Sequence, residues 1–478
     1  MKASRLLALL CTMLILVGAY TAASWYAGRE DQTRIEQFVE QINLGLAAQW
    51  PVSEPQALLR IEDYQRGWFS SDIHYQFVFQ GEDGRPQHIA FQDALNHGPW
   101  PWAALREGDW HPAMAYSQLA LSGGGLTAPW FDGVHGGGGT PLMISTRIGF
   151  DGTAHSVWLV RPAQVRASGM QLDIGAGRLT VDYDADTRAS SAQGSLGELT
   201  LLALDTGERM HLQDLSLQSN NAFSGDSGMQ AHYRAQVGQT TIQQPDAPVV
   251  GLKTLVVMLD AAQTGALADA QLRYTVDQVQ VGATDLGAFD LGMRAQQVNV
   301  AAFQALAQAW ADITGDDDAE GLTPAEQAVL TQHLLPVLAA GPSFLLEPAS
   351  RRNDKGRSQA SASVIFQAPS PQAQADTDPG AVLEDALRQA RLTLEVSRPM
   401  VIEAVRRASP HDADRAAAMA GMMYDHFIGQ FSRAGLIELQ QDVARLDLSY
   451  GAGQVVLNGR SMPVADFYAL ISPLLMSQ

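Results

Sequence analysis

The segment Gly225-Asp226-Ser227-Gly228 is the first place where the residue types suggest chemistry, because chymotrypsin-like serine proteases carry their nucleophile in such a loop. A nucleophilic serine needs a base and an orienting acid. In those proteases a Gly-Pro follows the loop and an Ala-His-Cys motif lies upstream of it. This sequence has neither feature. Gly, Asp and Ser are also typical of a hairpin turn, and strand-like runs at 208–218 and 229–237 flank the segment. We therefore predict a turn.

Two glycine runs, Gly123–Gly125 and Gly136–Gly139, are candidates for phosphate-binding loops. Such a loop needs a Lys and a Ser or Thr after its glycines and leads into a helix. Thr140-Pro141 leads into a strand-like run instead. Both runs are therefore predicted to be plain loops.

An acidic cluster near residue 315 is a candidate calcium site; its members are Asp312, Asp316, Asp317, Asp318 and Glu320. An EF-hand alternates its acids and places Gly sixth and Glu twelfth. This cluster does neither, so it is predicted to be a solvated loop between helices.

The histidines and methionines give no metal site either. The eleven histidines include no H-E-x-x-H, and no C-x-x-C occurs. His74 falls on the polar face of a strand and His97 in a turn, so neither is predicted to be a ligand. Met419, Met422 and Met423 are predicted to pack in a core. The sequence thus predicts no catalytic residue, no cofactor and no metal.

Charge and cysteine content narrow the functional class. Acids outnumber bases by 51 to 31, which gives a formal charge of −20. This balance argues against nucleic-acid binding and against broad docking onto anionic lipid, although a local basic patch is compatible with it. Cys11 is the only cysteine, so no internal disulfide can form. Leu10 stands before it where a bacterial lipoprotein needs a small residue.

Residues Leu6–Gly28 form an uncharged apolar run, and about 20 residues suffice to span a bilayer as a helix. Lys2 and Arg5 precede the run, so the positive-inside rule places the N-terminus in the cytoplasm and the body outside. The alternative is a cleaved signal peptide with an apolar region over Leu6–Gly18. We favour the anchor, because helical spacing continues through residues 29–50 as an expected stalk.

Beyond residue 50 the apolar residues alternate with a period of two. Ile73, Tyr75, Phe77 and Phe79 share one face of a strand. Comparable runs occur at 143–150, 155–161, 178–184, 197–203, 208–218, 229–237, 250–259, 269–281 and 288–300. Turns such as Ser219-Asn220-Asn221 are predicted between them. Many short strands indicate an antiparallel sheet that buries one face.

Helical patterns enter near residue 300. Helices are predicted at 301–313, 323–340 and 412–434, and a Pro-rich loop at 368–379. Strands are expected at 357–366, 390–396, 436–449 and 453–458, and a short apolar helix at 463–475.

The segment Tyr64-Gln65-Arg66-Gly67-Trp68-Phe69-Ser70-Ser71 resembles the pattern Tyr-x-Arg-Gly-x-Phe-Ser-Ser of the YdgA-like family of bacterial inner-membrane proteins, a domain of unknown function. Asn96-His97-Gly98-Pro99 resembles the family's His-Gly-Pro turn, and Arg147-Ile148-Gly149-Phe150 its Arg-Ile-Gly-aromatic strand. Further similar positions close the chain; they are Tyr450, Gly453, Leu457, Asn458, Gly459, Asp466 and Phe467. The resemblance implies an uncleaved anchor, a periplasmic body and self-association, and it offers no activity and no catalytic residues.

The motif residues also have an interpretation of their own. We expect Arg66-Gly67 to turn into a strand that Trp68 and Phe69 anchor, with Ser70 and Ser71 bonded to backbone groups. The motif positions Tyr64, Arg66, Gly67, Phe69, Ser70, Ser71, His97, Gly98 and Pro99 are therefore predicted to be structural.

Together these patterns predict an α+β, mainly β fold, with a large curved antiparallel sheet covered in part by helices and preceded by one transmembrane helix. The expected segments are a cytoplasmic tip (1–5), an anchor (6–28), a helical stalk (29–50), a β-rich body (51–300) and an α+β part of that body (301–478).

The functional hypothesis is a single-pass protein of the bacterial inner membrane with a periplasmic, non-enzymatic body that associates with protein, either as a homodimer or with an envelope partner. The alternative is that helices leave an apolar sheet face open as a groove for lipid or another apolar ligand, since exposed apolar surface usually has a use. An enzyme whose site is assembled from distant residues is the third hypothesis.

Overall fold

The computed structural model describes residues 35, 36, 39, 40, 43, 57–80, 85–124, 127–134, 139–167, 169–225, 228–314, 322–409 and 412–475. The predicted tip at 1–5 and the predicted anchor Leu6–Gly28 lie outside these residues. Across the described ranges, no helix combines the length and apolarity needed to cross a membrane. The chain forms two compact units, Met1–Ser219 and Asn220–Gln478, and 22 strands are described.

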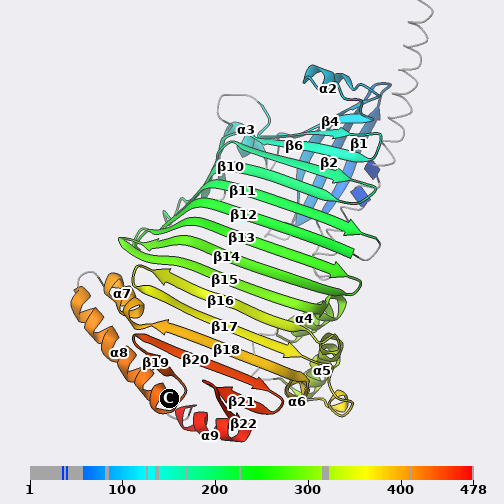
Figure 1. The fold of residues 1–478 in the computed structure, drawn as a ribbon. Helices are drawn as coiled ribbons and strands as arrows, with labels where there is room; N and C mark the ends of the chain where they lie inside the picture. The colour runs from blue at the N-terminus through cyan, green and yellow to red at the C-terminus, as the bar shows by residue number, and fades with distance from the viewer. Residues whose placement is uncertain are drawn as a thin grey trace, which may run out of the picture. The chain divides into compact units, whose positions relative to one another are not determined.

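The first unit is an antiparallel sheet (Figure 1). Its strands are β1(Leu58–Arg66), β2(Ser70–Gln80), β3(Pro86–His97), β4(Ala115–Leu121), β5(Leu142–Ile148), β6(Thr153–Val160), β7(Ala163–Ala167), β8(Met170–Ile174), β9(Gly177–Asp184) and β10(Ser190–Ala203). The short helices α2(Trp102–Arg106) and α3(Ala128–Asp132) lie in its connections. The strand β11(Arg209–Ser224) crosses the boundary between the units. Consecutive strands from β1 to β6 pair as a meander.

Two extended segments are each interrupted by two residues without a change of register: β6 continues as β7, and β8 continues as β9. β6 and β7 pair with β9 and β8, respectively, in one continuous alignment. β9 and β8 likewise pair with β10 in one continuous alignment. The interruptions fall at Arg161-Pro162 and at Gly175-Ala176. Proline lacks the N–H that a ladder needs, which accounts for the first break. The sheet thus continues past both interruptions.

A helical segment packs on one face of this sheet. Residues 35, 36, 39, 40 and 43 are helical, and Ile35 contacts the buried cluster of Ile73, Leu95 and Ala115. Asn43 continues the contact at the edge strand β1, where its side chain donates to the carbonyl of Leu59 at 2.9 Å and accepts from the amide of Leu59 at 2.8 Å. The side-chain amide of Asn43 thus satisfies the backbone N–H and C=O of Leu59, which an edge strand would otherwise leave unpaired.

The second unit contains long strands followed by shorter ones. They are β12(Gly228–Gln243), β13(Val250–Thr264), β14(Leu267–Val281), β15(Thr284–Asn299), β16(Ser343–Asn353), β17(Gly356–Phe366), β18(Leu387–Ser397), β19(Glu438–Gln440), β20(Val443–Gly451), β21(Gln454–Leu457) and β22(Arg460–Pro463). Its helices are α4(Val300–Thr314), α5(Pro324–Ala339), α6(Pro379–Ala386), α7(Arg398–Ala408), α8(Ala413–Arg433) and α9(Val464–Leu475), with a 3₁₀ turn η2(Ala373–Ala375).

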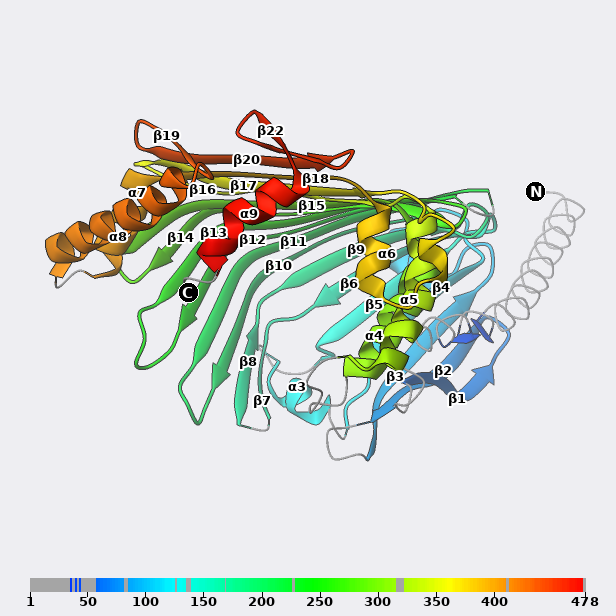
Figure 2. The same cartoon turned by 90° about the horizontal axis from the view of Figure 1, so that it is seen from below.

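Strands β12 to β18 pair with their sequence neighbours, and β20 pairs with β18. The short β19 and β21 take the two halves of β20's other edge, and β22 follows β21. In Figure 1, α7 and α8 lie at the strand ends where β14 turns into β15, whereas α4, α5 and α6 lie at the opposite ends. Figure 2 shows that β12 to β14 bend along their length.

The antiparallel, mainly β prediction is confirmed, and the helices expected at 301–313, 323–340 and 412–434 correspond to α4, α5 and α8. The predicted turn at Ser219-Asn220-Asn221 is wrong, because these residues continue β11. Asparagine favours turns by its local hydrogen bonding, but strand pairing overrides that preference. The strands β1, β3, β4, β7, β8, β16 and β22 were missed as separate strands.

Two further corrections concern side chains. His97 is the last residue of β3 and is buried, rather than sitting in a turn. Met419, Met422 and Met423 do not pack in a core, since they are 56%, 66% and 52% exposed. α8 packs instead through Ala420, Gly421 and Tyr424, which are the residues it buries.

Candidate functional site

The YdgA-like motif residues meet at one end of the first unit's sheet. The turn between β1 and β2 closes with the Gly67 amide donating to the Ser70 carbonyl at 2.7 Å. A Cβ on Gly67 would lie 2.8 Å from that oxygen, so only glycine fits. At the neighbouring strand end, Gly98 takes φ +108° and its amide donates to the Met114 carbonyl, while the Pro99 carbonyl accepts from Ala113.

Tyr64 packs against the buried cluster around Ile73, whereas Arg66 and Ser70 are exposed. The expectation that Trp68 and Phe69 anchor the strand is wrong, because they are 65% and 46% exposed. Their turn extends past the end of the sheet. The Phe69 carbonyl accepts from the His97 amide at 2.8 Å, so its backbone joins the β1–β2 turn to β3.

Ser71 and His97 form a buried polar pair on this sheet. The Ser71 Oγ and His97 Nε2 lie 2.8 Å apart, and the two residues are 3% and 1% exposed. Ser71 therefore bonds to a side chain rather than to the backbone group predicted for it. A Ser–His pair is the core of a nucleophilic site, but such a site must admit a substrate. Burial this complete indicates a structural pair.

Asp93 and Ser117 form a second polar pair, which sequence reasoning missed. Ser117 Oγ donates to Asp93 Oδ1 at 2.7 Å, and Asp93 is 4% exposed. Burial raises the pKa of Asp93 from 3.8 to about 6, although the hydrogen bond from Ser117 opposes the shift. Asp93, Leu95 and His97 alternate onto one face, so the two polar pairs flank the apolar Leu95. The period-two pattern of β3 could have revealed this arrangement.

The other sequence candidates do not come together. β11 ends at Ser224 and β12 begins at Gly228, so the Gly225–Gly228 segment connects consecutive strands, and its residues 226 and 227 lie outside the described part. Gly123 and Gly124 follow β4, while residues 125, 126 and 135–138 lie outside the description, as do 315–321 of the acidic cluster. Among the described residues no group of His, Cys, Asp or Glu could hold a metal ion.

An apolar row crosses the second unit from β12 to β21. Successive cross-strand partners along it are Tyr233, Leu259, Leu272, Met293, Leu346, Ala362, Leu392, Leu448 and Leu457. Neighbouring strands lie about 4.8 Å apart, so nine strands extend this row over about 38 Å. We call the sheet face that carries this row the apolar face.

The apolar face is only partly covered. Tyr233, Met293 and Leu392 are each 39–40% exposed, and Tyr274 and Phe289 on the same face are 36% exposed. Only Leu457, at the end of the row, is fully buried among the row's residues. The middle of the face therefore presents apolar side chains to the surroundings.

The opposite face of the same strands is polar. Cross-strand ion pairs join Arg273 to Asp290 with Nη2–Oδ2 at 2.6 Å and Arg391 to Asp447 with Nη2–Oδ2 at 2.8 Å. Arg294 pairs with Glu347 in the same way. These ion pairs make the opposite face suited to contact with water, so the two faces of the sheet differ in polarity.

Helices border the apolar face at both strand ends. At one end Leu338 of α5 and Val382 of α6 form a buried cluster against Phe366, and the ring of Phe366 contacts that of Phe344 edge-on at 6.4 Å. At the other end Met400 of α7 lies with its sulfur 3.8 Å from Ser358 Oγ. Ser358 and Phe366 are eight residues apart on β17, about 26 Å of strand. Figure 2 shows both groups of helices on the same side of the strands.

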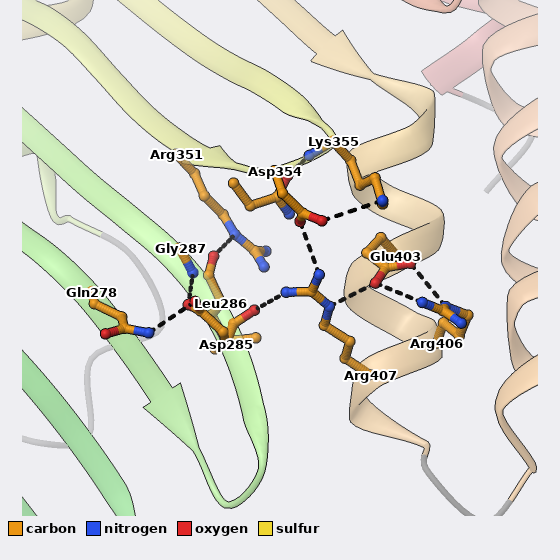
Figure 3. A network of polar contacts seen from close by, with 11 residues as sticks. Gln278, Asp285, Leu286, Gly287, Arg351, Asp354, Lys355, Glu403, Arg406 and Arg407 are labelled. Carbon is orange, nitrogen blue, oxygen red and sulfur yellow. Dashed lines mark hydrogen bonds and ion pairs between the residues drawn. The ribbon is translucent and has the colours of Figure 1, made fainter.

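A charged network fixes α7 at this position (Figure 3). Glu403, 6% exposed, accepts from Nε of Arg407 at 2.6 Å and from Nε and Nη2 of Arg406 at 2.8 Å. Arg407 in turn donates to the carbonyl of Asp285 and to Oδ1 of Asp354, both at 2.8 Å. The network thus ties α7 to the β14–β15 and β16–β17 turns.

The backbone beside this network depends on Gly287. Its φ is +88°, its amide donates to Asp285 Oδ1 at 2.8 Å, and a Cβ there would lie 2.0 Å from the Arg352 carbonyl oxygen. Glycine alone permits both the left-handed conformation and the close approach. The bulge in β15 at this point shifts its pairing with β14.

Two pockets are lined by described residues of the second unit, and neither of these two resembles a catalytic cleft. One, of about 990 Å³, lies between α6 and the β20–β21 hairpin and is lined mainly by polar residues. The other, of about 430 Å³, lies beside the Asp285 turn. Neither contains a histidine, and neither includes Asp93 or Glu403, whose pKa values are displaced. The geometry thus gives the enzyme hypothesis no specific support.

The model of the family "Bacterial protein of unknown function (DUF945)" matches residues 5–465. The chain belongs to the DUF945 family. It is similar to the protein YdgA of Escherichia coli K12, with 24% identity over 95% of this chain and 94% of that protein. It is also similar to the uncharacterized protein YihF of the same strain, with 21% identity over 95% and 96% of the two chains. No solved structure matches. The predicted resemblance to the YdgA-like family is confirmed.

Asp93→Asn in this DUF945 protein should remove a pH dependence of stability. Because the folded-state pKa is raised, the folded protein holds a proton between pH 3.8 and about 6 that the unfolded chain has lost. The wild type should therefore lose stability as the pH rises through this window, by up to about 3 kcal/mol. Denaturant unfolding at several pH values measures this dependence, and the exposed Asp63→Asn is the control. Equal slopes in Asp93→Asn and wild type would contradict the prediction.

Glu403→Gln should loosen α7. Hydrogen bonds from Arg406 and Arg407 lower the pKa of Glu403 to about 2, so its contribution is complete above pH 4.5 and declines as the pH falls toward 2. Removing this charge should cost about 2 kcal/mol at pH 7, the usual size for charged hydrogen bonds. Hydrogen exchange in residues 398–408 reports the loosening. Arg415→Gln, which removes an exposed pair with Asp412, serves as the control and should change little.

Proposed function

We propose that this DUF945 protein holds the acyl chain of a lipid or another single-chain amphiphile on the apolar face of its second unit. The observation that carries the proposal is the row of nine apolar side chains, of which Tyr233, Met293 and Leu392 stay 39–40% exposed. Contiguous exposed apolar surface of this extent is rarely left without a ligand or partner. The sequence favoured protein association over lipid binding; the open face favours the lipid.

The dimensions and the chemistry of the face support an acyl chain as the occupant. Half of a hydrocarbon core about 30 Å thick is about 15 Å, which is shorter than the stretch of β17 between its bordering helices. Ala360, Ala362 and Val364 occupy that stretch and are half-buried. Small side chains between two helix groups leave room for a slender chain, whereas a second flat sheet would meet the helices first.

The proposed location is the bacterial inner membrane, with Leu6–Gly28 as a single anchor and the body in the periplasm. This rests on the uncharged run, on Lys2 and Arg5 before it and on the family resemblance. A lipid-holding protein on such an anchor would stay next to its source of ligand. The role is proposed to be non-enzymatic.

The second candidate function is association of two copies of this chain through α8. Met419, Met422, Met423 and Phe427 form an exposed apolar stripe on this helix, with 51–66% of each side chain accessible. Methionine adapts to varied partners, so such a stripe suits a protein contact. This candidate retains the homodimer predicted from the sequence.

Val257→Glu should reduce lipid binding. Val257 pairs with Tyr274 on the apolar face, and a carboxylate there would have to be desolvated against an acyl chain. The amount of co-purifying lipid and the affinity for a fluorescent fatty acid should fall at least about tenfold, which corresponds to 1.4 kcal/mol. Native mass spectrometry of gently extracted full-length protein measures the first quantity.

Met258→Glu is the matched control. Met258 lies on the polar face, where its sulfur is 3.3 Å from Nη1 of Arg234, so a carboxylate meets a cation there and lipid binding should not change. Wild type that carries no lipid and binds no fatty acid would rule out the lipid proposal. A dimer mass without lipid would favour association instead.

Alkaline phosphatase fused after residue 60 should be active in cells, because the proposed topology exports everything that follows the anchor. The enzyme matures only outside the reducing cytoplasm. The paired measurement is fractionation of spheroplasts with an antibody to the body. An inactive fusion, or a body released into the soluble fraction, would exclude the anchored topology.

A further inference from the structure

Exposed aromatic side chains gather at the motif-bearing end of the first unit. Of seven Trp and Phe residues in its described part that are at least 36% exposed, six lie in three connections at this end; they are Trp68, Phe69, Trp100, Trp102, Trp110 and Phe150. Trp158 on β6 is the seventh.

Strand pairing shows that the three connections are neighbours. The His97 amide donates to the Phe69 carbonyl, and the Met114 amide donates to the Ile148 carbonyl, both at 2.8 Å. The Gly98 amide joins the two by donating to the Met114 carbonyl at 3.0 Å. The turn at 67–69, the connection at 98–114 and the turn at 149–152 therefore form one edge, which we call the aromatic end.

The helical segment on the sheet indicates where the aromatic end points. Ile35 packs beside Ile73 and Leu95, close to the aromatic end, whereas Asn43 bonds to Leu59, whose partner on β2 is Phe77. The chain direction from Asn43 back to Ile35 thus runs toward the aromatic end. In the sequence the predicted anchor Leu6–Gly28 ends seven residues before Ile35, so the end of the segment nearer the predicted anchor is also the end nearer the aromatic end.

Acids at the aromatic end have partners within the protein. Glu107 accepts from Tyr116 and Gln118, and Asp109 accepts from His111 and pairs with Arg147. The guanidinium of Arg106 lies 5.8 Å from the ring centre of Trp102. The ion pair with Arg147 offsets the negative charge that Asp109 would otherwise present to lipid phosphates.

We propose that the aromatic end inserts its Trp and Phe side chains into the headgroup layer of the bilayer that holds the anchor. Tryptophan favours this layer because its ring is apolar while its N–H still finds a polar partner. The proposal rests on the anchored topology proposed above. The contact would orient the first unit's strands relative to the membrane, which a single helix leaves free to swivel.

Spin labels on full-length protein test this proposal. Cys11→Ser removes the native cysteine, and Trp110→Cys and Phe150→Cys place labels at the aromatic end. His88→Cys, exposed toward the other end of β3, is the matched control. The protein is reconstituted into vesicles of phosphatidylethanolamine and phosphatidylglycerol. Accessibility to oxygen and to a water-soluble nickel chelate is then compared.

Labels at 110 and 150 should be shielded from the nickel chelate at least about threefold relative to the label at 88 and should be more accessible to oxygen. Flotation of the same samples reports whether the protein is anchored at all. Protein that floats with all three labels equally exposed to nickel overturns the aromatic end while the anchor stands. Protein that does not float overturns both. Agreement between sites 110 and 150 guards against misfolding of one variant.

Discussion

Cross-strand register is the constraint on which the second unit depends. Side chains alternate between faces, so a slip of one residue would exchange the apolar and polar sides of a strand. Pairing partners stay apolar from Tyr233 on β12 to Leu457 on β21 because each of the nine strands keeps its phase. The ion pairs of the other face, such as Arg273 with Asp290, belong to the same registers. Exposed pairs add little stability, but a slipped strand would place their charges among leucines.

The fold class followed from the sequence because alternation with a period of two is a local signal. The period is visible in Ile73, Tyr75, Phe77 and Phe79 without knowing any partner strand. What sits opposite each strand is not local information, and this is why Ser219–Asn221 was mistaken for a turn. The same limit applies to α8. Its helical period could be predicted from the sequence, but how deeply it packs on α7 could not. Met419, Met422 and Met423 were therefore wrongly assigned to a core.

The candidate sites show the same division. The resemblance to the family located the motif residues. The close backbone contact at Gly67 explains why that position requires glycine. The partnership of Ser71 with His97 and of Ser117 with Asp93 required the strand alignment, since each pair joins different strands. The sequence also indicated an apolar sheet face. How much of it helices cover depends on distances across the sheet, which only the three-dimensional arrangement reveals.

The meander from β12 to β18 has a consequence for how the chain reaches its folded state. Each strand adds to the one synthesised just before it, so no later segment has to thread between two strands already paired. Such connectivity keeps most sheet contacts short in sequence, a property that goes with faster folding. The growing sheet exposes one fresh edge at a time, and exposed edges invite aggregation. The outer edge of β20 pairs with β19 and β21, which are only three and four residues long, so this edge of the sheet ends in short strands.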